Sequence, residues 1–232
     1  MATRLIIAIL IIIPAAWSQS RLEVTAKIGA PMLNSFNTGS FSFLGTGFHQ
    51  GSSATRRYTA GAGVELRLPH GLGAEVDVLY KRLGYDVNSN PSPDVPVAFL
   101  HTWSTANSWE FPVLGVYHPY HREHFAPRVS AGVSFRTISG ASTSGQCYVL
   151  SSVYSQFCQS TAPVAEPADS HLNARSSFGG TFGAGIEMKA GLMRIVPEVR
   201  YTRWRADSSQ PQTPFDLRSN PNQLDVLLGI TF

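Results

Sequence analysis

Apolar and polar residues alternate along eight segments of the chain, each bounded by loop-forming residues. Alternation with a period of two indicates a β-strand with one apolar face. The pattern predicts strands at residues 22–28, 58–68, 72–80, 109–117, 129–135, 178–188, 193–201 and 224–232. No segment of helical periodicity competes with them in length, so the sequence predicts an all-β fold.

The segments between the predicted strands alternate in length. Residues 69–71, 118–128 and 190–192 form the shorter connections, and residues 32–57, 81–108, 136–177 and 202–223 form the longer ones. Short turns at one end and long loops at the other are typical of transmembrane β-barrels, whose tilted strands need about 9–11 residues to cross a bilayer. An even number of strands places both chain ends on the short-turn side.

The two faces of the predicted strands differ sharply in charge. The face that begins and ends each strand contains no Asp, Glu, Lys or Arg. The opposite face contains twelve charged residues: Glu23, Lys27, Glu65, Arg67, Glu75, Asp77, Glu110, Glu187, Arg194, Glu198, Arg200 and Asp225.

Alternation alone does not decide which face is outside, because a soluble barrel of the lipocalin type is apolar within and a membrane barrel is apolar without. Three features favour the membrane barrel. The polar face is rich in glycine, which suits a narrow lumen, and the chain ends on the phenylalanine of an apolar strand. Aromatic residues also form two interfacial girdles. The upper girdle comprises Tyr58, Tyr80, Trp109, Phe135, Phe178 and Tyr201, and the lower one comprises Tyr117 and Phe232.

The interior of an eight-stranded barrel is just wide enough for side chains to fill. We therefore expect the twelve charges to pair across the lumen, because an unpaired buried charge is costly. Lys81, Arg128, Arg136, Lys189 and Arg203, near the strand ends, roughly balance the excess of acidic residues. This interpretation favours a structural core of salt bridges over an ion pathway or proton relay.

The first 18 residues have the features of a secretory signal peptide. Arg4 precedes an apolar run at residues 5–13, too short to span a bilayer, and small residues occupy the cleavage-site positions Ala16 and Ser18. Residues 19–232 then form the mature domain. In an exported protein Cys147 and Cys158, the two cysteines of the chain, are expected to form a disulfide that stabilises the loop by about 2–3 kcal/mol.

Four segments carry a resemblance to a known family. They are RLPHGLGAEVDVLYKRLGY (residues 67–85), PRVSAGVSFR (127–136), VPEVRYTRW (196–204) and the closing LDVLLGITF (224–232). With them the chain resembles the outer membrane β-barrel domain family, related to OmpA-like and OmpX-like small barrels, over residues 21–232. The resemblance implies an eight-stranded antiparallel up-and-down transmembrane β-barrel in the bacterial outer membrane. It also implies contact with outer-membrane lipid and lipopolysaccharide, and assembly by the barrel-assembly machinery through the strand that ends at Phe232.

Two groups of histidines are candidates for chemistry. His118, His121 and His124 lie in a periplasmic turn with zinc-like spacing, but without further fixed ligands they are better interpreted as solvated. His49, His101 and His171 lie in outer loops among many serines, where a rim enzyme acting on lipids would place its base. No nucleophile motif accompanies them, so no catalytic residue, metal or cofactor is predicted.

The outer loops offer a third possibility. Residues 32–57 and 136–177 carry aromatic residues among glycine and serine, a composition that suits binding of an extracellular partner or packing within the loops. Either loop could also add a hairpin and bring the strand count to ten. The charge balance, 18 Lys and Arg against 15 Asp and Glu, is too even to predict nucleic-acid binding. A structural or surface-interaction barrel is the leading hypothesis, followed by a small-solute channel and then by a rim enzyme.

Overall fold

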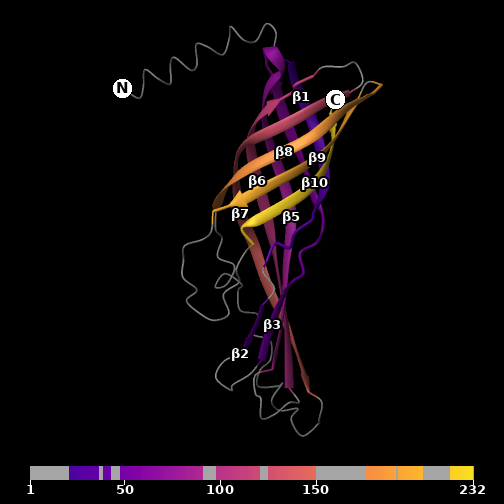
Figure 1. The fold of residues 1–232 in the computed structure, drawn as a ribbon. Coiled ribbons are helices and arrows are strands. Elements are labelled where there is room, and N and C mark those ends of the chain that lie inside the picture. The colour runs from indigo at the N-terminus through magenta and orange to yellow at the C-terminus, as the bar shows by residue number, and fades with distance from the viewer. Residues whose placement is uncertain are drawn as a thin grey trace.

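The computed structural model describes residues 21–36, 39–42, 48–90, 98–120, 125–149, 176–191, 193–205 and 220–231. The predicted signal peptide lies outside these residues. Eight long strands form an antiparallel barrel (Figure 1). They are β1 (Arg21–Pro31), β4 (Thr59–Arg67), β5 (Leu72–Asn90), β6 (Ala98–Tyr117), β7 (Phe125–Val149), β8 (Ser177–Ala190), β9 (Met193–Trp204) and β10 (Asn222–Thr231).

The barrel closes because β1 pairs with β10. Their register runs from Thr25 opposite Thr231 to Pro31 opposite Asp225, and the hydroxyl groups of Thr25 and Thr231 lie 2.8 Å apart. Each of the other strands pairs with its two neighbours around the ring. Closure matters because lipid offers no partner for the backbone groups of an open edge. The predicted all-β, eight-stranded up-and-down barrel is confirmed. Within the described ranges, no helix has the length and apolarity to cross a membrane.

The outside of the barrel is apolar and the inside is polar. None of the side chains described on the predicted apolar face is buried; Leu22 is 68% exposed and Phe182 is 63% exposed. In contrast, Asp77 and Arg200 on the opposite face are at most 1% exposed. This arrangement is the inverse of a soluble barrel, and it is stable where the surroundings are hydrocarbon.

Three strands continue well beyond the predicted barrel. The predictions that residues 81–108 and 136–177 are loops are wrong in part, because β5 runs on to Asn90, β6 begins at Ala98 and β7 ends at Val149. The outer halves of β5 and β6 pair from Lys81 opposite Ser108 to Ser89 opposite Leu100. Outside lipid neither face of a strand must be apolar, so these segments lack the alternation that marks the membrane-spanning parts.

The long connection after β1 contains two short strands, β2 (Gly39–Ser42) and β3 (Phe48–Ser53). β3 pairs with the outer half of β5, from Ser53 opposite Tyr85 to Phe48 opposite Asn90. The resulting outer sheet has the order β2-β3-β5-β6-β7 and projects from one end of the barrel (Figure 1). The predicted alternative of an added hairpin is therefore correct for this loop, but the hairpin lies outside the ring and the barrel keeps eight strands.

Two prolines occur inside barrel strands, and each interrupts one ladder. Pairing of β8 with β9 stops after Gly185 opposite Glu198 and resumes at Met188 opposite Ile195, whereas Pro197 stays in register with β10. Pairing of β5 with β6 is likewise interrupted next to Pro112, which stays in register with β7. A proline lacks the N–H that one of its two neighbouring strands would use, so only one ladder is affected.

Candidate functional site

The middle of the barrel interior contains a compact ion network. Lys27 Nζ lies 2.8 Å from both Glu75 Oε1 and Asp77 Oδ2. Arg200 reaches the same two carboxylates, with Nη2 3.0 Å from Glu75 Oε1 and Nη1 2.7 Å from Asp77 Oδ2. Arg200 also contacts Glu198 at 3.1 Å. Two cations and three carboxylates from three strands therefore meet in the middle of the barrel, and Arg128 of β7, which contacts Glu75, supplies a third cation.

Glycine makes room for this network. A Cβ atom at Gly63 would lie 1.9 Å from Asp77 Oδ1. A Cβ atom at Gly183 would lie 2.3 Å from Ser130 Oγ and 2.6 Å from Glu198 Oε1. Atoms cannot approach so closely, so a larger residue at either position would displace these side chains. Glycine at the two positions therefore leaves the space that the side chains occupy.

The periplasmic end of the interior holds a second network. Arg194 contacts Glu187 at 2.7 Å and also contacts Glu23, while Arg67 contacts Glu23 at 2.9 Å and also Glu187. His118 lies among them, with Nε2 3.6 Å from Glu187 Oε2.

His118 also lies near Glu65, with Nε2 3.7 Å from Oε1. It is only 3% exposed, so the prediction that it is a solvated turn histidine is wrong. Its position at the end of β6 continues the inward-facing row of that strand, which turns the ring into the lumen.

The outer end of the interior holds a third network. Lys81 Nζ lies 3.0 Å from Glu110 Oε2 and 2.8 Å from Asp225 Oδ2. Gln223 donates to the same two carboxylates and accepts a 2.8 Å hydrogen bond from Trp204 Nε1.

Above this network, the Arg136 guanidinium lies 4.5 Å from the centre of the Trp204 ring, a cation–π contact. The indole thus contacts both Gln223 of the third network and Arg136.

An apolar cluster covers the outer mouth. Phe36, Leu83, Ala106 and Ile138 are buried together, with Tyr85 packed against them. The rings of Phe36 and Tyr85 meet edge to face at 5.5 Å. Burial raises the pKa of the Tyr85 hydroxyl above its ordinary value, which keeps the group neutral in this setting. Phe36 comes from the segment after β1, so that segment folds over the barrel mouth.

All twelve of the charged residues predicted for the lumen lie on the inner face. The pairing within the barrel also depends on two buried residues that were expected only near strand ends, Lys81 and Arg128, the second of which contacts Glu75 and lies 3.7 Å from Glu65. Arg136, expected near a strand end as well, is buried against Trp204. Lys189 and Arg203 are exposed and do not contribute. The three buried cations could have been predicted from alternation along the strands, because every second side chain lies on the same face. Lys81, for example, lies on the same face as Glu75 and Asp77.

Most of the predicted upper girdle forms a chain of aromatic contacts. Tyr80 lies 6.3 Å from Tyr58 and 5.0 Å from Trp109, and Phe135 lies 5.1 Å from Phe178. Tyr201 lies on the same outer face of β9, half-buried. At the opposite end Tyr117 is exposed, whereas Phe232 lies outside the described residues.

The remaining predicted sites lie in or beyond the outer sheet. Cys147 near the end of β7 is disulfide-bonded, and Cys158 is outside the described residues. The ring of His101 lies 5.5 Å from the ring of Trp103 and is tilted by 58° to it. His121, His124, His171 and the side chain of His49 also lie outside what the structure describes. Among the described residues, no group of His, Cys, Asp and Glu is arranged to hold a metal ion.

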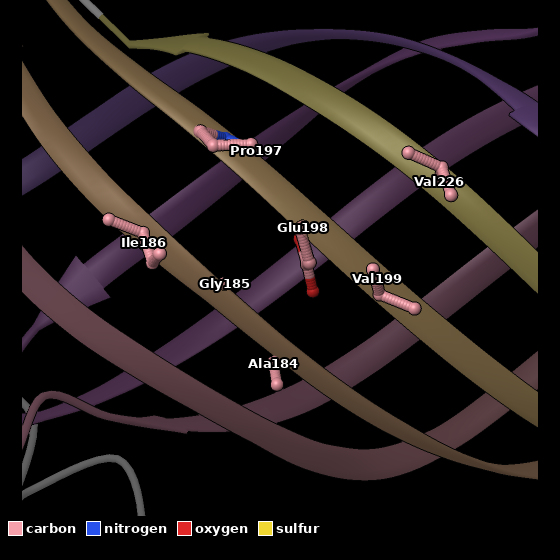
Figure 2. Close-up of a pocket in the computed structure, with 7 residues that line it drawn as sticks. All are labelled: Ala184, Gly185, Ile186, Pro197, Glu198, Val199 and Val226. Carbon is pink, nitrogen blue, oxygen red and sulfur yellow. The ribbon is translucent and has the colours of Figure 1, made fainter.

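A groove of about 360 Å³ lies in the barrel wall where Pro197 interrupts the ladder. Figure 2 shows Ile186 and Ala184 along β8 on one side, Pro197 and Val199 along β9 on the other, and Val226 of β10 beyond them. Its lining is almost entirely apolar, and Ala184, Ile186 and Val199 belong to the outward face. The groove is therefore mainly a feature of the lipid-facing wall, and Glu198 of the central ion network also lines it.

Comparison with known proteins agrees with this architecture. The family model described as "Outer membrane protein beta-barrel domain" matches residues 17–203. The chain belongs to this outer-membrane β-barrel family. It is therefore an integral protein of the bacterial outer membrane. No curated protein matches the chain.

Several solved structures of outer-membrane barrels are similar to the chain. Neisserial surface protein A is 11% identical, with 91% of this chain and 97% of that chain covered and a TM-score of 0.41. OprG of Pseudomonas aeruginosa is 12% identical, with 91% and 95% covered and a TM-score of 0.41. The N-terminal barrel domain of OprF from the same organism is 11% identical, with 92% and 97% covered and a TM-score of 0.38.

Proposed function

We propose that this outer-membrane barrel is a sealed, non-catalytic anchor that presents its outer sheet for interactions at the cell surface. The observation that carries the proposal is the filling of the interior by side chains at several levels. Three ion networks occupy the lumen one after another, and the cluster of Phe36, Leu83, Ala106 and Ile138 lies at the outer end. A solute would have to break several buried ion pairs to pass, and removing one partner of such a pair costs about 3–5 kcal/mol.

The outer sheet supplies the surface for interaction. Beyond the girdle, residues 137–145 of β7 pair with β6 on one side, and no described strand pairs with them on the other. These residues, TISGASTSG, contain no charge and no proline. Charged residues and proline protect the edges of natural sheets from pairing with other chains. An edge that lacks both is suited to pairing with an extended segment of another chain.

Conductance across a planar lipid bilayer tests the seal. The purified full chain, shown to be folded by its heat-dependent shift in gel mobility, is expected to give no discrete current steps at either polarity. Reproducible steps from the folded protein would instead support the small-solute channel.

An edge-blocking variant tests the interaction surface. Ser144→Lys places a charge on the outer edge of β7, and Gln50→Lys places the same charge on β3 at a position paired with both β2 and β5, as a matched control. Bacteria that express the wild-type protein are expected to adhere to one another or to a surface, and Ser144→Lys to reduce this adhesion at equal surface expression while Gln50→Lys does not. Equal adhesion of the Ser144→Lys variant and the wild type would remove the edge from the proposal.

The composition of lipopolysaccharide tests the proposal that the barrel is not an enzyme. Lipopolysaccharide from cells with and without the protein is expected to have the same acyl chains by mass spectrometry. An acyl chain that disappears only when the protein is present, and persists with His101→Ala, would establish a rim enzyme.

A further inference from the structure

Arginine follows tyrosine at the same spacing on two strands that face each other across the barrel. Arg82 lies two residues outside Tyr80 on β5, and Arg203 lies two residues outside Tyr201 on β9. Side chains two residues apart share one face of a strand, so each arginine stands directly above its tyrosine on the outer surface. The rise of two residues is about 7 Å along the strand.

Arg56 joins Arg82 on the outer rim above β4. The backbone N–H of Arg56 donates to the carbonyl oxygen of Arg82 at 3.2 Å, which places the two residues side by side. Arg56 and Arg57 are both exposed, and they immediately precede Tyr58, which contacts Tyr80 in the girdle. Three arginines therefore gather above the aromatic contacts of β4, β5 and β6.

Polar neighbours hold Arg82 in place. Its Nη1 donates to Asn107 Oδ1 at 3.1 Å, and its Nη2 donates to Thr105 Oγ1 at 3.1 Å. The same Asn107 oxygen accepts a 2.8 Å hydrogen bond from the hydroxyl of Tyr80. A guanidinium has five N–H donors, so these two contacts orient the group without exhausting its capacity.

The second site repeats the arrangement on β9 and β10. The hydroxyl of Tyr201 donates to Asn222 Oδ1 at 2.7 Å, and Asn222 lies directly opposite Arg203 in the β9–β10 register. Each unit thus contains a girdle tyrosine, an arginine on the next outward position of the same strand and an asparagine on the adjacent strand. Arg205, also exposed, lies just beyond Arg203.

Among the residues with described side chains, the acidic groups lie away from these arginines. Every Asp and Glu of this set except Asp86 lies in the interior, together with interior cations. Asp86 lies four residues beyond Arg82, in the outer sheet. Of the described side chains on the outer surface just beyond the girdle, all that carry a charge are therefore basic.

We propose that Arg56, Arg82 and Arg203 bind the phosphate groups of lipopolysaccharide in the outer leaflet. The girdle marks the boundary of the hydrocarbon, so a position about 7 Å further out lies at the depth of the lipid headgroups. The planar guanidinium matches a phosphate in a bidentate geometry, and it pairs with phosphate in preference to water at such an interface. This inference does not depend on the proposed role of the outer sheet.

Native mass spectrometry of the full chain in non-ionic detergent tests the proposal. The probes are bisphosphorylated lipid A, the same lipid A without phosphates, and phosphatidylglycerol. The test variant is Arg56→Gln/Arg82→Gln/Arg203→Gln, and the control is Lys189→Gln, which removes an exposed cation at the periplasmic end. Heat-dependent gel mobility verifies that each variant is folded.

The wild type and Lys189→Gln are expected to bind bisphosphorylated lipid A equally, and the triple variant at least tenfold more weakly. Removing the phosphates from lipid A should weaken binding to the wild type by a similar factor. Unchanged binding of the triple variant, or of the dephosphorylated lipid, would overturn the proposal. Equal binding of phosphatidylglycerol would overturn the assignment to lipopolysaccharide and identify a general site for anionic lipids.

Discussion

Arg200 on β9 donates a 2.7 Å hydrogen bond to Asp77 on β5, and these two strands face each other across the barrel. The bond therefore spans the lumen and joins opposite walls. Arg200 and Asp77 are both essentially inaccessible to solvent. A contact of this kind fills the lumen as well as stabilising it, because no solvent space remains between the two walls at that level.

Replacing Arg200 with methionine should strongly destabilise the barrel. Arg200→Met removes one of the two cations that Glu75, Asp77 and Glu198 share and leaves Lys27 alone among them, and breaking a buried ion pair on one side costs about 3–5 kcal/mol. Urea titration of the protein in lipid vesicles, followed by tryptophan fluorescence, measures the free energy of unfolding. Arg203→Met on the same strand is the matched control and should change it by less than about 0.5 kcal/mol, because Arg203 is exposed. Equal effects would show that the network does not stabilise the barrel.

A single methyl group at Gly63 should also destabilise the barrel. The added Cβ of Gly63→Ala would lie 1.9 Å from Asp77 Oδ1, so the carboxylate must move away from Lys27 and Arg200. Overpacking of this kind costs about 1–3 kcal/mol. Gly180→Ala is the control, because nothing lies within 4 Å of a Cβ atom at that position. The same unfolding titration distinguishes the two, and a neutral Gly63→Ala would contradict the close packing of the network.

Amide hydrogens in the β8–β9 ladder, which is interrupted at Pro197, should exchange faster than those in the continuous β9–β10 ladder. Ile186 lies opposite Pro197 in the interrupted part of the β8–β9 ladder, whereas β9 and β10 remain in register at Leu228. Hydrogen exchange measured by NMR in detergent micelles is expected to show faster exchange at Ile186 than at Leu228. Pro197→Ala, which restores an N–H donor, should reduce the difference. Uniform protection in the wild type would contradict the interruption.

Reduction of the disulfide at Cys147 should loosen the outer sheet and leave the barrel intact. A cross-link between cysteines so close in sequence stabilises its loop by about 2–3 kcal/mol. Cys147 lies near the far end of β7, well beyond the ion networks. Limited proteolysis of reconstituted protein should therefore become faster after reduction with dithiothreitol, while the heat-dependent gel shift persists. Loss of the gel shift on reduction would show that the cross-link supports the barrel itself.

The membrane-spanning part of the fold could be predicted because its signal is local. Lipid requires an apolar side chain at every second position, so residues such as Leu22, Val24 and Ile28 reveal both the strand and its outward face. The same constraint made the inner positions of Glu75 and Asp77 predictable from parity alone. Outside the lipid this constraint ends, and the continuation of β5, β6 and β7 into the outer sheet left no comparable pattern.

The sequence by itself determined the barrel, its apolar outer face and the twelve charged positions that face inward. The tertiary structure decided which charges meet, that Lys81 and Arg128 complete the networks, that His118 and Arg136 are buried, and that Phe36 packs with Leu83, Ala106 and Ile138. It also brought Arg56 beside Arg82. Alternation specifies the face on which a side chain lies, whereas its partner depends on the register and tilt of strands far apart in the sequence, which form only when β1 and β10 close the ring.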